Sequence, residues 1–517
     1  MWIPWRGGGA SSPAGLPSEV AAPTRPVSSC APPATHKEYK IRKVHKRLVL
    51  LTLLGVVAGL GLTAGQAETS LAQTTPQPNI LFVLTDDMNV SDLRYMPNAR
   101  RLLADQGAKF TNAFVSNSLC CPSRVTILRG QYSHNHLIWA NEPPLGGFEK
   151  FRELGREKST IATWLDRAGY DTVLIGKYLN GYDDTTYVPS GWDEWHGYLG
   201  GYYHENTYQI NENGHIATYD RSRIHDTDLF ANKAARFIRK TAGGAPFFMY
   251  LATNAPHTPA NAPQRHAGMF SDTTLPNPPS FNEADVSDKP AWVRDKPRLT
   301  PAYVDYLRDL HRQRLRSLQS VDEMVGKLKN GLRATGELSN TYVVFTSDNG
   351  YHLGEHRLEA KATPYEEAIR VPLLVRGPGV LPGVSRSMMV LNNDLAPTFA
   401  DLAGVTPPSF VDGRSLSRLL SVSPPASPRS AFLIEHRRSA YEGPFVRRVP
   451  NYYAVRTTRH LYVEYESGAR ELYDLTSDPY ELQSRHRTAG TGLKRRLASR
   501  LAELSGCAAE GCRSAEK

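Results

Sequence analysis

Apolar residues occur in short runs between about residue 78 and residue 411, and amphipathic stretches separate these runs. The sequence contains no internal repeat. Apolar runs of strand length that alternate with helical patterns are typical of an α/β domain with a largely parallel sheet. The pattern therefore predicts a mixed, mainly parallel sheet flanked by helices for the larger part of the chain.

Four of these runs end in polar residues. The runs are NILFVLT, DTVLIG, PFFMYLA and TYVVFTS. In open α/β sheets, ligands bind outside the carboxyl ends of the strands. Polar residues that follow four strands of one sheet therefore predict one shared pocket. These residues are Asp86, Asp87, Lys177, His257, Asp348 and Asn349.

Beyond about Val411 the pattern changes. A Pro/Ser-rich stretch, SVSPPASPRS, precedes three segments with the alternation of antiparallel strands, YYAVRTT, HLYVEYES and RELYDLT. A helix rich in Arg and Leu is predicted at about 492–504. Since 517 residues exceed the size of most single cores, we predict three parts. They are an N-terminal extension and signal peptide at 1–72, a main α/β domain at 73–415 and a C-terminal α+β subdomain at 416–517.

The N-terminus is typical of a secretory leader. A basic segment, KEYKIRKVHKR, precedes the apolar LVLLTLLGVVAGLGLTA, and small residues follow. Cleavage is predicted near Ala67 or Ala72. A retained membrane anchor is the alternative, although the apolar run is a little shorter than the ~20 residues of a spanning helix. Residues 1–47 hold eight Lys/Arg and two Asp/Glu, so the net charge of +10 belongs mainly to the leader and does not indicate nucleic acid binding.

Export implies an oxidising compartment, and the chain has five cysteines. The first of them precedes the predicted cleavage site, and Cys507 and Cys512 are spaced for a local disulfide. Cys120 and Cys121, considered alone, are typical of buried thiols. However, Pro122 can occupy the first turn of a helix, which places Cys120 beside the positive end of the helix dipole. That position favours a nucleophile that acts on an anion.

The acidic residues after the first and last of the four runs are candidate metal ligands. Singly, each has a simpler interpretation, because Asp-Asp can cap a helix and Asp-Asn-Gly is an ordinary turn. Together, three carboxylates and one amide oxygen form a ligand set suited to Ca²⁺ or Mg²⁺, and no Cys/His spacing indicates zinc.

The segment CCPSRVTILRG resembles the C-x-P-S-R-x-x-x-x-x-G motif of the sulfatases, in which the first cysteine is oxidised to formylglycine. In this register that cysteine is Cys120, and Cys121 occupies the variable position. The resemblance extends from about Pro78 to ELYDLTSDPYEL and implies an alkaline-phosphatase-like fold whose small C-terminal sheet closes one side of the pocket. The chain most resembles the N-acetylglucosamine-6-sulfatases and the extracellular heparan sulfate 6-O-sulfatases, through LTDD, LCCPSR, GKYLN, APHTP, TSDNGYH and VPLLVRGPG.

The resemblance also implies roles for individual residues. One Ca²⁺, or Mg²⁺, would be bound by Asp86, Asp87, Asp348, Asn349 and an oxygen of modified Cys120. Arg124 matches the arginine that supports the formylglycine. Lys177, His257 and Lys361 match residues that hold the sulfate and assist the leaving group. Many arylsulfatases have a histidine directly after the lysine of the GK motif, whereas Tyr178 follows Lys177 here, and this difference favours a carbohydrate substrate.

The mechanism that the family implies is attack by a hydrated formylglycine. One hydroxyl of the geminal diol attacks sulfur, and the second can later lose its proton and expel sulfate as the aldehyde reforms. Further substrate contacts are predicted at four residues near the motifs. Two loops, at 181–219 and 260–298, are expected to determine which substrate is bound. His436 and Arg437 could reach the substrate from the C-terminal subdomain. The four residues are Tyr178, Asn180, His352 and His356.

The resemblance predicts a secreted hydrolase of sulfate esters, with 6-O-sulfated N-acetylglucosamine as the expected group. The expected partners are a sulfated carbohydrate or aryl sulfate substrate and the formylglycine-generating enzyme, with no stable membrane partner unless the leader is retained. Two alternatives stay open: an arylsulfatase or phosphate/phosphonate ester hydrolase of the same superfamily, and a non-catalytic protein that binds sulfated glycans. The lone sequon at Asn89 adjoins the predicted metal ligands, which favours a bacterial source without glycosylation.

Overall fold

The computed structural model describes residues 77–517, except 184, 201–205, 422 and 425–428. Cys30 and the predicted cleavage sites near Ala67 and Ala72 lie outside these residues. The described residues all belong to one unit, so the predicted division between 415 and 416 stays a prediction. Among the described residues, no helix combines the length and the apolar character needed to cross a membrane.

A ten-stranded sheet forms the centre of the described residues, in the order β13-β2-β12-β9-β1-β8-β4-β5-β6-β7. Its five middle strands, from β9 to β5, are all parallel. The outer strands pair in antiparallel fashion except β13 with β2. The mainly parallel sheet is therefore confirmed. The strands are β1 (Asn79–Thr85), β2 (Ala108–Phe110), β4 (Asp171–Gly176), β5 (Glu194–Leu199), β6 (Thr207–Glu212), β7 (His215–Asp220), β8 (Phe247–Ala252), β9 (Thr341–Ser347), β12 (Leu373–Arg376) and β13 (Val384–Arg386).

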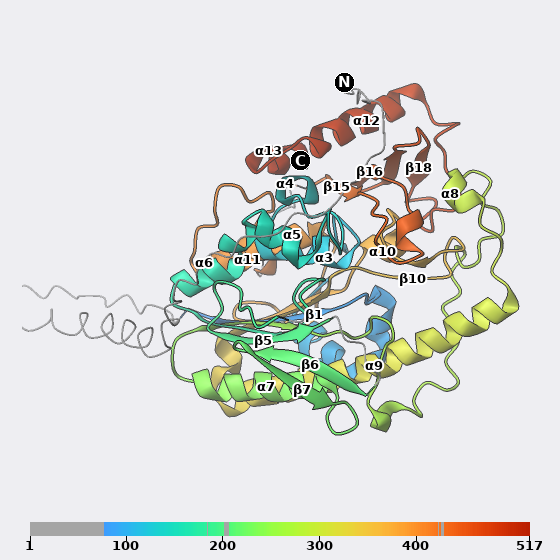
Figure 1. The fold of residues 1–517 in the computed structure, drawn as a ribbon. Coiled ribbons are helices and arrows are strands. Elements are labelled where there is room, and N and C mark those ends of the chain that lie inside the picture. The colour runs from blue at the N-terminus through green and yellow to red at the C-terminus, as the bar shows by residue number, and fades with distance from the viewer. Residues whose placement is uncertain (1–76, 184, 201–205, 422, 425–428) are drawn as a thin grey trace, which may run out of the picture. The chain divides into compact units, whose positions relative to one another are not determined.

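Helices cover both faces of this sheet (Figure 1). Helices α7 (Asp226–Thr241) and α9 (Pro301–Ala334) lie on one face, whereas α3 (Cys120–Arg129), α6 (Ile161–Arg167) and α11 (Leu395–Leu402) lie on the other. Successive side chains of a strand point to opposite faces. Accordingly, Leu81 and Val83 of β1 pack with α7 and α9, and the alternate residues of β1 pack with the other helices. Burial on both faces explains why β1 is apolar throughout.

The C-terminal part forms a separate antiparallel sheet of four strands, β15-β16-β17-β18. Helix α12 (Thr491–Ser505) packs against β15 and β16, and Cys507 and Cys512 form a disulfide. The predicted strands, helix and disulfide are thus confirmed. The strands are β15 (Ala431–His436), β16 (Tyr452–Thr457), β17 (His460–Tyr465) and β18 (Arg470–Asp474).

The interpretation of residues 181–219 as a loop is wrong. Strands β5 and β6 and most of β7 lie in this range and extend the main sheet. The turn between β6 and β7 contains Asn213 and Gly214, which both have positive φ, as a tight hairpin requires. This Asn-Gly pair was the sequence signal for the hairpin. Residues 260–298, by contrast, are largely irregular apart from η4 (Gln264–His266) and α8 (Ala291–Arg294).

Candidate active site

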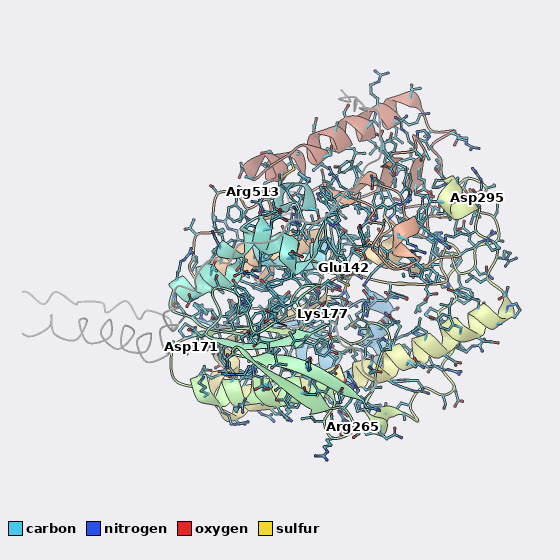
Figure 2. All side chains as sticks on the ribbon, in the orientation of Figure 1. Glu142, Asp171, Lys177, Arg265, Asp295 and Arg513 are labelled. Atoms are coloured by element: carbon cyan, nitrogen blue, oxygen red, sulfur yellow. A yellow bond between two sulfur atoms is a disulfide. The ribbon has the colours of Figure 1, made fainter. Side chains whose placement is uncertain are left out.

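Polar residues meet where the four central strands end. Strands β9, β1, β8 and β4 are neighbours in the sheet, and they run in parallel toward the same edge. Figure 2 shows this direction on β4, whose first residue, Asp171, lies far from Lys177, the residue that follows the strand. The parallel arrangement of these four strands therefore explains why the polar residues at their ends lie close together.

Cys120 is the first residue of α3, and its side chain is fully buried at the centre of the site. The Cys120 Sγ lies 3.2 Å from Asp86 Oδ1 and 3.9 Å from Asp87 Oδ1. Lys361 Nζ approaches the same sulfur to 2.7 Å. Burial, together with the nearby Asp86, raises the pKa of the Cys120 thiol well above its ordinary value. An unmodified thiol would thus be protonated at neutral pH and would be a poor nucleophile.

The acidic side chains around Cys120 form a set of oxygen donors. The ligand atoms of Asp86, Asp87, Cys120 and Asp348 all lie within 4.8 Å of one another. Asp87 Oδ2 and Asn349 Oδ1 are buried and have no hydrogen-bond partner among the described residues. Buried polar atoms normally have partners. The oxygen set and these two atoms therefore fit a hard cation such as Ca²⁺ or Mg²⁺.

Three cationic side chains oppose the three carboxylates. Lys177 pairs with Asp86, Lys361 pairs with Asp87, and Arg124 Nε donates to Asp348 Oδ2 at 2.8 Å. Burial alone would raise the pKa of Asp86, but Lys177, His257 and Arg124 hold it well below its usual range.

Asp348 behaves differently from Asp86. Burial and the adjacent Asp86 raise the pKa of Asp348 to about 6 despite its contact with Arg124. The charged form of Asp348 is therefore less well stabilised by its neighbours than that of Asp86. A further positive charge would stabilise it.

Among the basic residues of the site, His257 has the most exposed side chain, at 27%, compared with 14% for Lys177. Its Nδ1 lies 2.6 Å from the carbonyl oxygen of Thr258, which can only accept, so Nδ1 donates. The other ring nitrogen, Nε2, lies 3.8 Å from Asp87 Oδ2. Burial lowers the pKa of His257. At neutral pH its Nε2 is therefore available as a proton acceptor.

A narrow pocket opens beside these residues and includes Asp86, Lys177 and His257 in its wall. Its outer wall contains polar residues that sequence reasoning missed. Arg221 Nη1 donates to Asp226 Oδ2 at 2.9 Å, and Asn254 Nδ2 lies 3.4 Å from the same oxygen. No motif marks these three residues, because they come from the β7–α7 connection and the end of β8.

A second missed pair supports the start of α3. Asn141 Oδ1 accepts from the N–H of Cys121 at 2.9 Å, and Glu442 Oε1 accepts from the N–H of Asn141 at 2.6 Å. Glu442 follows β15, so the C-terminal part contacts the segment that holds the cysteine. Tyr452 of β16 also donates to the carbonyl oxygen of Ala362, next to Lys361, at 3.2 Å. These contacts join Asn141 to Glu442, 301 positions apart, and Ala362 to Tyr452, 90 positions apart, which sequence spacing cannot reveal.

Tyr178 and Asn180, which were predicted to touch the substrate, lie among residues that differ from the polar side chains around Cys120. Tyr178 is 2% exposed and packs among Phe148, Phe151 and Trp195. Asn180 is half-buried, and its carbonyl oxygen accepts from the N–H of Phe148. The structure therefore places Tyr178 in an aromatic core, and a substrate contact for either residue stays a prediction.

The predicted histidine contacts are also buried. His352 Nε2 lies 2.7 Å from the Thr363 hydroxyl, and burial lowers the pKa of His352 to about 3. His356 Nδ1 lies 2.7 Å from Glu283 Oε2. His436 is 1% exposed, while Arg437 stacks over the ring of Trp139 at 4.3 Å. The structure does not bring the rings of His352, His356 and His436 into contact with the side chains around Cys120.

The fold and the site define a hydrolase with alkaline-phosphatase-like architecture, in which a helix N-terminus, oxygen donors and basic side chains converge on one residue. The Sulfatase family model matches residues 78–405, so the chain belongs to the sulfatase family and is a sulfuric ester hydrolase. A second family model, N-sulphoglucosamine sulphohydrolase, C-terminal, matches residues 354–506. The predicted family, fold and enzyme class are confirmed.

Relatives add detail to this assignment. A Caenorhabditis elegans extracellular sulfatase Sulf-1 homolog is 38% identical over 362 residues, which are 68% of this chain but only 50% of that protein. The human N-acetylglucosamine-6-sulfatase is 32% identical over 504 residues, 90% of each chain. A solved structure described as a complex with its substrate D-glucosamine-2-N,6-O-disulfate has a TM-score of 0.71 and 27% identity, and the match covers 85% of this chain and 98% of that one.

Proposed function

We propose that this sulfatase hydrolyses 6-O-sulfate esters of N-acetylglucosamine residues in glycans, with position 120 as the source of the nucleophile. The observation that carries the proposal is the contact of Cys120 Sγ with both Asp86 and Lys361 at the N-terminus of α3. A helix N-terminus and basic side chains favour an anionic group at this point. A sulfate ester is such a group.

Two additional groups complete the chemistry. A hydrated formylglycine formed from Cys120 supplies a hydroxyl that attacks sulfur and a second hydroxyl whose deprotonation releases sulfate. A divalent cation, Ca²⁺ in our proposal, would increase the acidity of the attacking hydroxyl and polarise the sulfate oxygens. Asp86, Asp87, Asp348 and Asn349 would hold this cation, since they provide the oxygen donors and the two atoms without partners.

The basic side chains of the chain have separable tasks. Nearby carboxylates and Cys120 raise the pKa of Lys177 and Lys361 even though burial opposes the charged form. Both lysines therefore stay charged. They act as hydrogen-bond donors to the sulfate oxygens and keep their protons. Arg124 holds Asp348 in place through its Nε–H.

His257 is better suited to move a proton. Its pKa is lowered, and its Nε2 lies at the pocket wall. Neutral His257 can accept the proton that the attacking hydroxyl loses and then deliver it to the oxygen of the departing alcohol. Without that proton the alcohol would leave as an unstable alkoxide.

The substrate proposal rests on relatives and on the pocket. The human relative named N-acetylglucosamine-6-sulfatase matches over 90% of both chains. The outer pocket wall offers a guanidinium, a carboxylate and an amide, from Arg221, Asp226 and Asn254. Such groups suit the hydroxyls of a sugar better than the flat apolar ring of an aryl sulfate.

The site of action and the partners follow the same reasoning. We propose a bacterial, secreted enzyme whose leader is removed near Ala67 or Ala72, and relatives named extracellular sulfatases support secretion. Maturation requires a formylglycine-generating enzyme that reads the segment around Cys120. The remaining partner is the sulfated glycan itself.

Parallel assays with several esters test this proposal. Release of sulfate is measured from N-acetylglucosamine-6-sulfate, from glucosamine sulfated at other positions, and from an aryl sulfate, with an aryl phosphate and an aryl phosphonate as comparisons. The highest kcat/KM is expected for the 6-O-sulfated sugar. A preference for the phosphonate would assign the chain another reaction of the superfamily, and no hydrolysis of any ester would leave only glycan binding.

A further inference from the structure

A second cluster of possible metal ligands lies away from Cys120. It comprises His356, between β10 (His352–Leu353) and β11 (Glu359–Ala360), Glu367 on α10 (Glu366–Ile369), and Glu481, which follows β18. The ligand atoms of these three residues lie within 4.8 Å of one another. The cluster therefore brings together two segments of the main α/β part and one segment of the C-terminal part.

Each of the three residues directs a polar atom without a partner into this cluster. His356 Nε2, Glu367 Oε2 and Glu481 Oε1 are buried and form no hydrogen bond with any described residue. His356 is 0% exposed and Glu481 is 1% exposed. Leaving one such atom unpaired typically costs about 1–3 kcal/mol. Three of them within one small volume indicate a missing common partner.

The orientation of the His356 ring suits a metal ligand. Glu283 Oε2 lies 2.7 Å from His356 Nδ1, and when Glu283 is ionised it accepts from the ring, so that Nδ1 carries the proton. The lone pair of Nε2 then faces Glu367 Oε2 at 3.7 Å. A histidine that donates one N–H to a carboxylate and presents its other nitrogen is the usual arrangement around bound metals.

The charges in the cluster are not balanced by nearby side chains. Arg370 and Arg456 both pair with Glu366. Lys289 Nζ donates to the backbone carbonyl of Glu481 at 2.6 Å and lies 3.8 Å from Glu283. Among the described residues, neither Glu367 nor Glu481 forms an ion pair with a lysine or arginine. Two adjacent carboxylates, that of Glu481 buried and that of Glu367 half-buried, therefore require a cation or a shared proton.

We propose that His356 Nε2, Glu367 and Glu481 bind a divalent transition metal, for which Zn²⁺ is the best match. One imidazole nitrogen and two carboxylates are ligands that zinc accepts, whereas Ca²⁺ and Mg²⁺ prefer oxygen alone. Glu367 also lines a surface pocket with Glu355, Arg370 and other residues, and this pocket gives the ion a path of entry. The proposal is independent of the function proposed above, because none of its ligands belongs to the Cys120 cluster.

The bound metal would link the segment before Lys361 to the C-terminal part. His356, Arg357, Ala360 and Ala362 all have positive φ, which is strained for residues other than glycine. A metal held by His356 at one end of this segment and by Glu481 in the C-terminal part would stabilise that conformation. The expected effect of the metal is therefore on stability.

Zinc binding by the full-length protein tests the proposal. Metal-free protein is saturated with Ca²⁺ and then titrated with Zn²⁺ while bound zinc and the thermal midpoint are measured. One Zn²⁺ per chain and a rise in the midpoint of about 3 °C are expected for the wild type. Glu481→Gln, which keeps the size of the side chain, should lose both effects. His215→Gln, at an exposed histidine of β7, should keep them.

Anomalous diffraction at the zinc edge provides a readout that does not depend on the variants folding. Wild-type crystals grown with Zn²⁺ should show a peak between His356 Nε2, Glu367 Oε2 and Glu481 Oε1. Equal zinc binding by wild type and Glu481→Gln, or crystals without a peak at this place, would overturn the proposal and leave a shared proton between the two carboxyl groups.

Discussion

Two of the buried clusters of charged residues in the described part of the molecule differ in how completely their acceptor oxygens are paired. Around Arg429, every carboxylate oxygen has a donor: Asp394 accepts from Arg429 and from the backbone N–H groups of Leu391 and Arg414, and Glu516 accepts from Arg429, Arg414 and Tyr132. Around Cys120, by contrast, Asp87 Oδ2, Asn349 Oδ1 and Arg124 Nη2 have no hydrogen-bond partner among the described residues. Carboxylates whose oxygens are all paired stabilise a fold, whereas buried oxygens left without a donor can bind a ligand.

The comparison predicts opposite effects of mutation in the two clusters, and the largest is at Cys120. Cys120→Ala should lower kcat/KM for sulfate esters by about 10⁴-fold or more, because the nucleophile is lost. The free energy of unfolding should change by about 1 kcal/mol or less, since few buried atoms are removed. Cys121→Ala, one residue further along α3, is the matched control and should stay active. Comparable losses in both variants would show that helix packing, not the nucleophile, is responsible.

Arg429→Met should have the reverse pattern. Arg429 joins the start of α11 to the C-terminus through Asp394 and Glu516. Removal of its charge leaves two buried carboxylates without this partner, which should cost about 3–5 kcal/mol of unfolding free energy. Chemical denaturation measures this loss, and kcat of the folded fraction should change little. Arg495→Met, at an exposed arginine of α12, should be nearly neutral; equal destabilisation would contradict the distinction.

His257→Gln tests the catalytic cluster at its solvent-facing side. Loss of proton transfer to the leaving alcohol should reduce kcat by about 10²-fold, or about 2.7 kcal/mol in the barrier. The loss should shrink for esters of acidic alcohols, because such alcohols leave without protonation. A uniform loss across alcohols would instead indicate a role in binding. His215→Gln is the control at an exposed histidine.

The smaller of the two predicted losses of stability is a pH dependence at His134, whose two ring nitrogens both have partners. His134 Nδ1 lies 2.9 Å from Glu435 Oε2 on β15, and its Nε2 lies 2.9 Å from the carbonyl oxygen of Cys507. Burial opposes the charged ring, but Glu435 outweighs it and raises the pKa of His134 from 6.5 to about 9. A raised pKa in the folded state gives stability that is complete below pH 6.5 and is lost as the pH rises through 9.

The expected loss is about 3 kcal/mol between pH 6 and pH 10. Thermal unfolding across this range measures it. His134→Gln should lower stability at pH 6 and remove most of the slope. If stability depends on pH equally in this variant and in the wild type, groups other than His134 are responsible for the dependence.

Much of the catalytic cluster could be predicted because its residues follow apolar runs of strand length. Parallel strands bring their carboxyl ends to one edge, so Asp86, Lys177 and Asp348 converge as a consequence of topology. The helix start at Cys120 was visible from Pro122, which lies in the first turn of α3. The local disulfide and the alternating C-terminal strands could also be predicted from the sequence, since both depend on the spacing of residues close together in the chain.

Other features depend on contacts that spacing does not encode. Tyr178 was predicted to touch substrate because it follows Lys177, yet adjacent side chains can point in opposite directions, and Tyr178 packs in an aromatic core. The support of α3 by Asn141 and Glu442 joins residues 301 positions apart. The hairpin of β6 and β7 was the exception, because its Asn213–Gly214 turn was a local signal that the interpretation as a loop overlooked.

The central claim is that position 120 is not a cysteine in the active enzyme. Mass spectrometry of the tryptic peptide 110–124 from active, secreted protein tests it most directly, with sulfate release measured on the same sample. The account predicts a peptide with the mass of formylglycine at position 120 and a thiol at Cys121, in proportion to the activity. A peptide with two intact thiols in fully active protein would contradict it.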